Sequence, residues 1–180
     1  MRVLVALDTS EIGETAAIAM AVWSRSVPME IHVLSVVHTD DLHASRESAS
    51  FGEFAIPAGT VPGLISSDVA PAGDPLPMIV EYRGQAIEGA RSEREDYLRT
   101  VVARHLQGTS ATVRVELSDQ TADTIVETAK SLGVDAIAMG THGKSGIRHA
   151  LVGSVTEQVI RQSPVPVVLI GPGAHAALRP

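Results

Sequence analysis

Residues 134–155 read VDAIAMGTHGKSGIRHALVGSV, and this stretch indicates the fold more clearly than any other part of the chain. It begins with a mostly apolar run at 134–139, continues through a segment that contains four glycines, and leads into a helical pattern at 154–161. A strand followed by a loop and a helix is the repeating unit of parallel sheets. We therefore predict a strand, a glycine-rich loop and a helix in this order.

The rest of the chain repeats the alternation of strands and helices. Short apolar runs predict further strands at 3–7, 31–37, 112–117 and 165–170, and periodic apolar positions predict helices at 10–26, 77–108 and 122–132. Runs that are apolar throughout suit strands that are buried on both faces, as in parallel sheets. The order predicts an α/β fold, in which an open five-stranded parallel sheet is doubly wound, with helices on both faces.

One stretch interrupts this alternation. Thirteen of the 38 residues from 39 to 76 are Gly, Pro or Ser, and the stretch shows no sustained period. We predict one domain over residues 1–172, a long insertion at about 39–76, and a tail at 173–180.

Composition limits the classes of function. The 180 residues carry a formal net charge of −7, which argues against a surface that neutralises nucleic-acid phosphates. The absence of cysteine excludes disulfides, thiolate metal sites and a cysteine nucleophile. No apolar run has the length of a membrane span, and the first residues lack the pattern of a signal peptide, so we expect no membrane association and a cytoplasmic location.

The glycine-rich loop is the candidate functional element. Glycines let backbone N–H groups approach a ligand closely, and the N-terminus of a helix attracts phosphate. Ser154 and Glu157 match a capping box, which predicts Ser154 as the cap of the following helix. One alternative is that the glycines only make turns. Another is a Walker A loop at Gly143-Lys144-Ser145, although Ala138 stands where that motif needs glycine.

The spacing of this loop resembles the ATP-binding members of the universal stress protein family. Gly140 and Gly143 are separated by two residues, nine residues follow, and Gly153-Ser154 completes the family's pattern. The run at 6–10 and the run at 165–170 are also similar to the family. The resemblance implies an adenine nucleotide alpha hydrolase-like fold with strand order 3-2-1-4-5, whose switch point lies between the first and fourth strands.

The resemblance also implies a nucleotide site and its residues. Asp8 and the backbone of Val36 would contact adenine, and Gly140 would approach the ribose or the phosphates. Asp8 and Ser154 also have a simpler interpretation as helix-capping residues. The predicted nucleotide-binding residues are Ala6, Leu7, Asp8, Val36, Met139, Gly140, Gly143, Gly153, Ser154 and Val155; Ala6 and Met139 line the base pocket, and the last four hold the phosphates.

The function that the resemblance implies is a regulatory stress-response protein that binds ATP, with Mg²⁺ or Mn²⁺ carried on the phosphates and few protein ligands to the metal. We assign no catalytic residue and expect at most slow ATP hydrolysis. The family also implies a homodimer paired through the last strand, Val165–Ile170. Two alternatives remain open: a protein-interaction module with a vestigial site, and a small ATP-dependent hydrolase or transferase. The preference among ATP, AMP and cyclic nucleotides is also open.

Overall fold

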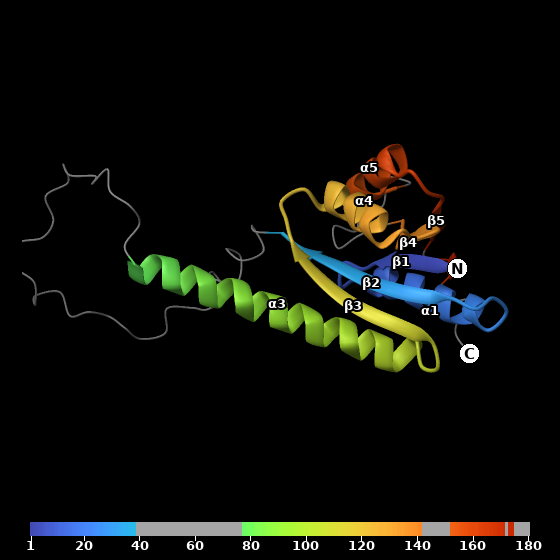
Figure 1. The fold of residues 1–180 in the computed structure, drawn as a ribbon, viewed down its shortest axis with the longest axis horizontal. Helices are drawn as coiled ribbons and strands as arrows, with labels where there is room; N and C mark the ends of the chain where they lie inside the picture. The colour runs from blue at the N-terminus through green and yellow to red at the C-terminus, as the bar shows by residue number, and fades with distance from the viewer. Residues whose placement is uncertain (39–76, 142–151, 172, 175–180) are drawn as a thin grey trace, which may run out of the picture.

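A computed structural model of the chain describes residues 1–38, 77–141, 152–171 and 173–174. Within them, five parallel strands form one sheet in the order β3-β2-β1-β4-β5, with helices on both faces (Figure 1). The predicted fold class and strand order are confirmed. In chain order the elements are β1 (Arg2–Ala6), α1 (Glu11–Ser24), β2 (Glu30–Val37), α3 (Pro77–His105), β3 (Ser110–Leu117), α4 (Thr121–Leu132), β4 (Ala136–Gly140), α5 (Ser154–Gln162) and β5 (Val167–Ile170).

The central strand β1 explains why the apolar runs are continuous. Its side chains alternate between the two faces of the sheet, and helices cover both. Val3 and Val5 belong to the apolar cluster that includes residues of α1 and α3, whereas Leu4 and Ala6 belong to the cluster formed with α4 and α5. Residues 3–6 therefore face an apolar cluster on either side of the sheet, and their run is apolar throughout.

The strand order creates a switch point beside β1. The chain leaves β1 toward β2 on one side, and later returns to form β4 on the other. Consequently α1 and α3 cover one face of the sheet and α4 and α5 cover the other (Figure 1). In open α/β sheets, ligands bind in the crevice that opens at the carboxyl ends of the strands where the winding reverses.

Helix α3 is longer than the sheet it covers. Its first half extends past the sheet in Figure 1, and residues 84–89 are exposed. Its second half packs on the sheet through Leu98 and Val101, which are buried. Arg94 lies near the point where the helix meets the body of the protein and is partly buried.

Two strands begin later than predicted, each for a local reason. Strand β4 begins at Ala136 rather than 134, because the N–H of Val134 still bonds to the carbonyl of Ala129 at the end of α4. Strand β5 begins at Val167 rather than 165, because Pro166 has no N–H to donate and joins the sheet only by accepting from the N–H of Ile137. The predicted end of α4 at Gly133 is confirmed, with φ at 58°.

The predicted capping box at the start of α5 is also wrong. The cap is Gly153, whose carbonyl accepts from the N–H of Glu157 at 2.9 Å, and Ser154 is the first helical residue. Its side chain makes no capping hydrogen bond. Glu157 instead pairs with Arg161 one turn later, at 2.7 Å.

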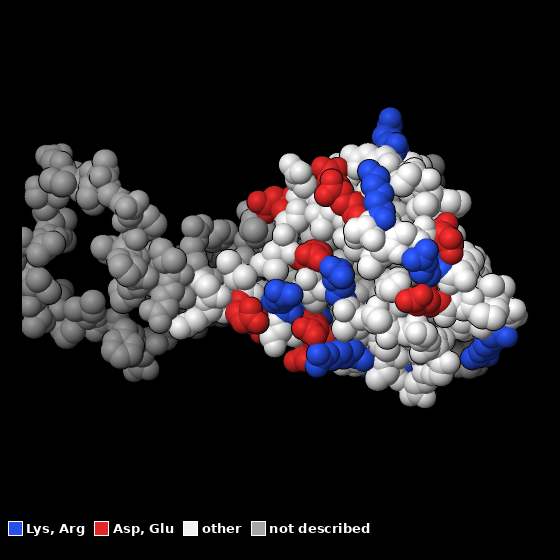
Figure 2. Space-filling view, in the orientation of Figure 1, with Lys and Arg blue, Asp and Glu red and all other residues white. Residues whose placement is uncertain are grey.

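Acidic and basic side chains are interspersed on the face that Figure 2 shows. Several form exposed pairs within one element, such as Arg99 with Glu95 on α3 at 2.6 Å and Arg114 with Glu116 on β3 at 3.1 Å. Exposed pairs of this kind contribute at most about 1 kcal/mol each to stability. The apolar clusters on the two faces of the sheet therefore dominate the stability of the fold.

Candidate functional site

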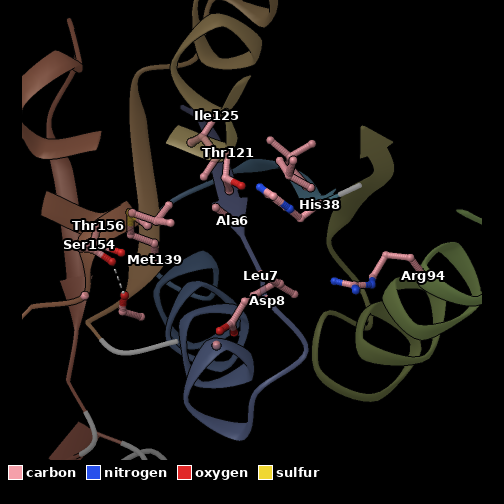
Figure 3. Close-up of a pocket in the computed structure, with 16 residues that line it drawn as sticks. Ala6, Leu7, Asp8, His38, Arg94, Thr121, Ile125, Met139, Ser154 and Thr156 are labelled. Atoms are coloured by element: carbon pink, nitrogen blue, oxygen red, sulfur yellow. Dashed lines mark hydrogen bonds between the residues drawn. The ribbon is translucent and has the colours of Figure 1, made fainter. Parts of the chain in front are cut away.

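A cavity of about 260 Å³ opens at the carboxyl ends of β1, β2 and β4 (Figure 3). It lies at the switch point, and residues from both helix layers line it. Its inner wall is apolar, formed by Ala6, Leu34, Ile125 and Met139. Polar groups stand around this wall, as in most sites for small molecules.

The structure brings together nine of the ten residues predicted for nucleotide binding. The tenth, Gly143, lies outside the described residues, as do Lys144 and Ser145 of the Walker A alternative. The nine that line the cavity come from β1, β2, β4, α5 and the adjoining turns: Ala6, Leu7, Asp8, Val36, Met139, Gly140, Gly153, Ser154 and Val155.

The turn between β1 and α1 fixes Asp8 at the edge of the cavity. The carboxylate oxygen Oδ1 accepts from the backbone N–H of Ser10 at 3.2 Å and from its hydroxyl at 2.6 Å. Ser10 caps α1, since its Oγ accepts from the N–H of Gly13 at 2.9 Å. Thr9 between them has φ at 67°, a left-handed conformation that is uncommon for a residue other than glycine. Asp8 therefore takes part in helix capping as well as lining the cavity.

Gly13 makes room for this carboxylate. A Cβ added at Gly13 would lie 2.5 Å from Oδ1 of Asp8, closer than non-bonded atoms tolerate. Gly13 also lines the cavity, although the sequence motifs do not predict it as a site residue. A glycine in the first turn of a helix, five residues after the candidate Asp8, is the signal that could have found it.

The amino end of α5 forms the opposite wall. The N–H of Gly153 donates to the carbonyl of Thr141 at 2.8 Å, and the hydroxyl of Thr156 donates to the carbonyl of Gly140 at 3.2 Å. These bonds tie the first turn of α5 to the end of β4. Ser154 is exposed, and among the described residues no acceptor bonds to the N–H groups of Ser154 and Val155. The first turn thus presents free donors and the positive end of the helix dipole to the cavity.

Other lining residues have no motif that would single them out in the sequence. Four of them line the cavity because of the face of the strand or helix on which they lie, which is known only from the fold: Leu34, Thr121, Ile125 and Thr156. His38 lies at the end of β2, with Nδ1 at 3.9 Å from a carboxylate oxygen of Asp119.

Arg94 reaches the cavity from α3. Its Nη1 donates to Oγ of Ser35 at 3.0 Å, and that hydroxyl donates to the carbonyl of Leu7 at 2.8 Å. Nothing in the helical pattern around residue 94 distinguishes this arginine from its exposed neighbour Arg91, so only the fold reveals it.

A polar network lies behind the Asp8 turn. The hydroxyl of Tyr97 donates to Oε1 of Glu14 at 3.1 Å, and Oε2 of Glu14 lies 3.3 Å from Nε2 of His105 and 3.8 Å from Arg104. Burial raises the pKa of Tyr97 well above its ordinary value, and the negative charges of Glu14 and Asp8 raise it further. Tyr97 is therefore a protonated donor that links α3 to α1 beside the site.

Comparison with known proteins decides the family. The sequence pattern of the universal stress protein family matches residues 64–171. The chain belongs to the universal stress protein family. The matched range includes the loop and α5, whereas the resemblance that we noted at residues 6–10 lies outside it.

Two curated members of the family are similar in sequence to parts of this chain. "Universal stress protein MJ0577" of Methanocaldococcus jannaschii is 50% identical over 46 residues, which are 26% of this chain and 28% of that protein. "Putative universal stress protein SH1215" of Staphylococcus haemolyticus is 33% identical over 91 residues, 49% of this chain and 55% of that protein. The matches thus span little more than half of these relatives at most.

Solved structures of the family share the fold over most of the chain. The structure of MJ0577 superposes with a TM-score of 0.69 and 20% identity, and the match covers 94% of each chain. A universal stress protein from Archaeoglobus fulgidus, solved in complex with dAMP, superposes with a TM-score of 0.53 and 19% identity, covering 94% of this chain and 97% of that one. At these identities the likeness establishes the fold of a universal stress protein.

Proposed function

We propose that this universal stress protein binds ATP, or another adenine nucleotide, in the cavity at the switch point, and that it acts as a regulatory stress-response protein. The observation that carries the proposal is the convergence of residues that resemblance to one family predicts from separate parts of the sequence. Asp8 at the end of β1 and Gly153-Ser154 at the start of α5 are far apart in the sequence, yet they line the same cavity. The Archaeoglobus relative solved with dAMP supports an adenine-containing ligand.

The lining of the cavity suits the parts of a nucleotide. The apolar wall, through Ala6 and Met139, suits the flat face of a base, with Asp8 and the backbone of Val36 at its edge. The free N–H groups of Ser154 and Val155 and the hydroxyl of Ser154 suit phosphate oxygens. In this assignment Gly140 lies beside the ribose, and Gly153 and Gly143 allow the backbone to approach the phosphates.

The few metal-binding side chains around the cavity favour a metal that is carried by the nucleotide. Among the described residues, no group of three or more histidine or acidic side chains could hold a metal ion. Asp8 is the one carboxylate among the described lining residues. Mg²⁺ keeps several water ligands and commonly binds through phosphates plus one or two carboxylates, so the residues present fit a metal–ATP complex. The bound metal would neutralise phosphate charge.

The chemistry of the cavity favours binding over efficient catalysis. Backbone donors at α5 stabilise phosphoryl charge, which is sufficient for slow hydrolysis. The described lining residues offer Asp8 and His38 as the only candidate bases, and Oδ1 of Asp8 is already bonded to Ser10. We therefore assign no catalytic residue and propose at most weak ATPase activity.

We propose a single domain over residues 1–172 with an insertion at about 39–76, a cytoplasmic location, and a homodimer paired through the last strand. Among the described strands, β5 pairs only with β4, and Leu169 on it is exposed, which supports pairing with a second copy. None of the described helices is both long and apolar enough to cross a membrane.

Mass spectrometry of ligand released from freshly purified, denatured protein tests the proposed function. We expect an adenine nucleotide, or, if the protein is purified empty, an increase in melting temperature on addition of ATP and Mg²⁺. Protein without nucleotide and without a thermal shift would support a vestigial site instead. Many turnovers of ATP per minute would support a true ATP-using enzyme.

A further inference from the structure

A buried serine connects helix α3 to the turn that carries Asp8. Ser35 on β2 is 1% exposed; its Oγ accepts from Nη1 of Arg94 at 3.0 Å and donates to the carbonyl of Leu7 at 2.8 Å. The direction of both bonds is certain, because a guanidinium only donates and a carbonyl only accepts. We call this chain of two hydrogen bonds, from Arg94 through Ser35 to Leu7, the relay.

The relay ends on the peptide group that leads into Asp8. The carbonyl of Leu7 and the N–H of Asp8 belong to one planar peptide group, so a bond to this carbonyl orients the backbone from which the Asp8 side chain starts. On either side, the N–H of Leu7 donates to the carbonyl of Leu34 at 2.9 Å, and Oδ1 of Asp8 accepts from Ser10. Thr9 follows with φ at 67°. Hydrogen bonds therefore fix this segment next to an uncommon backbone conformation.

Arg94 lies at the end of the cavity that is opposite α5. Figure 3 shows it reaching inward from α3, with Leu7 and Asp8 between it and Ser154. In the proposed function, on which this inference rests, the phosphates lie at α5 and the edge of the base lies at Asp8. Because adenine carries no charge at neutral pH, neutralisation of a ligand charge does not account for an arginine at this end. The relay instead connects the guanidinium to Asp8.

We propose that Arg94 is a positioning residue for recognition of the base. Through Ser35 it holds the peptide between Leu7 and Asp8, so that the Asp8 carboxylate accepts a hydrogen bond from the 6-amino group of adenine. An ionised carboxylate can only accept, and the amino group is the N–H donor that adenine offers in a nucleotide. A carboxylate has about four acceptor sites, so the bonds from Ser10 leave room for this one.

Isothermal titration of the full chain with two nucleotides, each with Mg²⁺, tests this proposal. ATP is compared with purine riboside 5′-triphosphate, whose base has hydrogen in place of the amino group. We expect the wild type to bind ATP roughly tenfold or more tightly, as a hydrogen bond to a charged group predicts. Arg94→Met, which keeps the bulk but has no donor, should lose most of this ratio through weaker ATP binding. Arg94→Lys, which keeps a charged donor, should retain part of it.

Ser35→Ala interrupts the relay at its middle and should lower the same ratio. Because Arg94→Met and Ser35→Ala break one chain of bonds, the double variant should lose no more of the ratio than either single variant. Loss in equal and additive steps would show that the two residues act separately, which contradicts the relay. Thermal melts establish that each variant is folded, and if Ser35→Ala does not fold, the two Arg94 variants decide the test.

Two variants on the same helix are the controls. Arg91 is exposed and does not line the cavity, so Arg91→Met should keep the wild-type ratio. Tyr97→Phe removes the bond from α3 to Oε1 of Glu14 but leaves the relay intact. It should lower the melting temperature and keep the ratio. An equal fall in the ratio from Tyr97→Phe would show that the general packing of α3, and not the relay, determines base recognition.

The remaining outcomes separate this inference from the proposed function. A ratio that Arg94→Met leaves intact would overturn the positioning role, and so would an equal loss of affinity for both nucleotides. If the wild type binds ATP and the analogue equally well, Asp8 does not recognise the amino group, and the inference fails while the proposed function stands. If the wild type binds neither nucleotide, the proposed function itself fails.

Discussion

Two strand-to-helix turns meet at the cavity, and they use their helix ends in opposite ways. At the β1–α1 turn, Ser10 caps the helix with its side chain, and the Asp8 carboxylate bonds to Ser10. At the β4–α5 turn, the cap is Gly153, which has no side chain, and the hydroxyl of Ser154 makes no capping bond. The β1–α1 turn uses its polar groups for its own structure, whereas the β4–α5 turn leaves its groups available to a ligand.

Because of this difference, the cap of α1 contributes to the stability of the fold, whereas the amino end of α5 is available for binding. A side-chain cap contributes about 1 kcal/mol to stability, and a glycine cap gives up only a few tenths of that. The β4–α5 turn is instead secured by bonds from Gly153 and Thr156 to the backbone of Thr141 and Gly140. The first turn of α5 is thereby fixed in place without using the donors that phosphate would need.

Gly153→Val should have the largest effect on binding. Gly153 has φ −69° and ψ 156°, which valine adopts without strain, so the free energy of unfolding should change by no more than about 1 kcal/mol. The branched side chain would occupy the space where the backbone meets the phosphates, and we expect at least a hundredfold loss of ATP affinity by titration calorimetry. Gly84→Val, at an exposed position of α3 with open space around its Cα, is the control. Normal ATP binding by Gly153→Val would contradict the phosphate assignment.

Gly13→Ala, in the β1–α1 turn, should have an intermediate effect on binding. The added Cβ displaces the carboxylate of Asp8, and we expect roughly a tenfold loss of affinity, equivalent to about 1.4 kcal/mol. Gly89→Ala on α3 is the matched control, since nothing lies within 4 Å of its added Cβ. This control should bind normally and gain about 0.5–1 kcal/mol in stability, as measured by urea denaturation. Equal affinities for the two variants would show that the position of Asp8 is unimportant for binding.

Substitution of Ser10 or Ser154 should give the smallest effects. One substitution should lower mainly stability, and the other mainly ATP affinity. Ser10→Ala removes the cap of α1 and should cost about 1 kcal/mol of unfolding free energy. Ser154→Ala should cost less than about 0.5 kcal/mol in stability but weaken ATP binding several-fold, because it removes only a donor to phosphate. Denaturation and calorimetry on both variants measure this contrast. A loss of stability from Ser154→Ala as large as that from Ser10→Ala would remove the distinction between the turns.

Local patterns were sufficient to predict the α/β class because the central strands β1 and β4 are buried on both faces. Val3, Leu4 and Val5 are all fully buried, so the apolar run itself marks a central parallel strand. The same patterns fail where a single residue decides the boundary. Pro166 shortens β5 from the predicted start at 165, and Gly153 displaces Ser154 as the cap of α5, although the sequence matches a capping box.

The alternation of strands and helices, the glycine spacing and Asp8 at a strand end are properties of the sequence alone, since each depends on residues that are close in the chain. The tertiary structure decided which distant residues share the cavity. Arg94 is recognisable only because α3 brings it to Ser35, 59 residues away in the chain. Helical periodicity places a residue on a face of its own helix, but only the packing of that helix on the sheet determines which charge reaches the cavity.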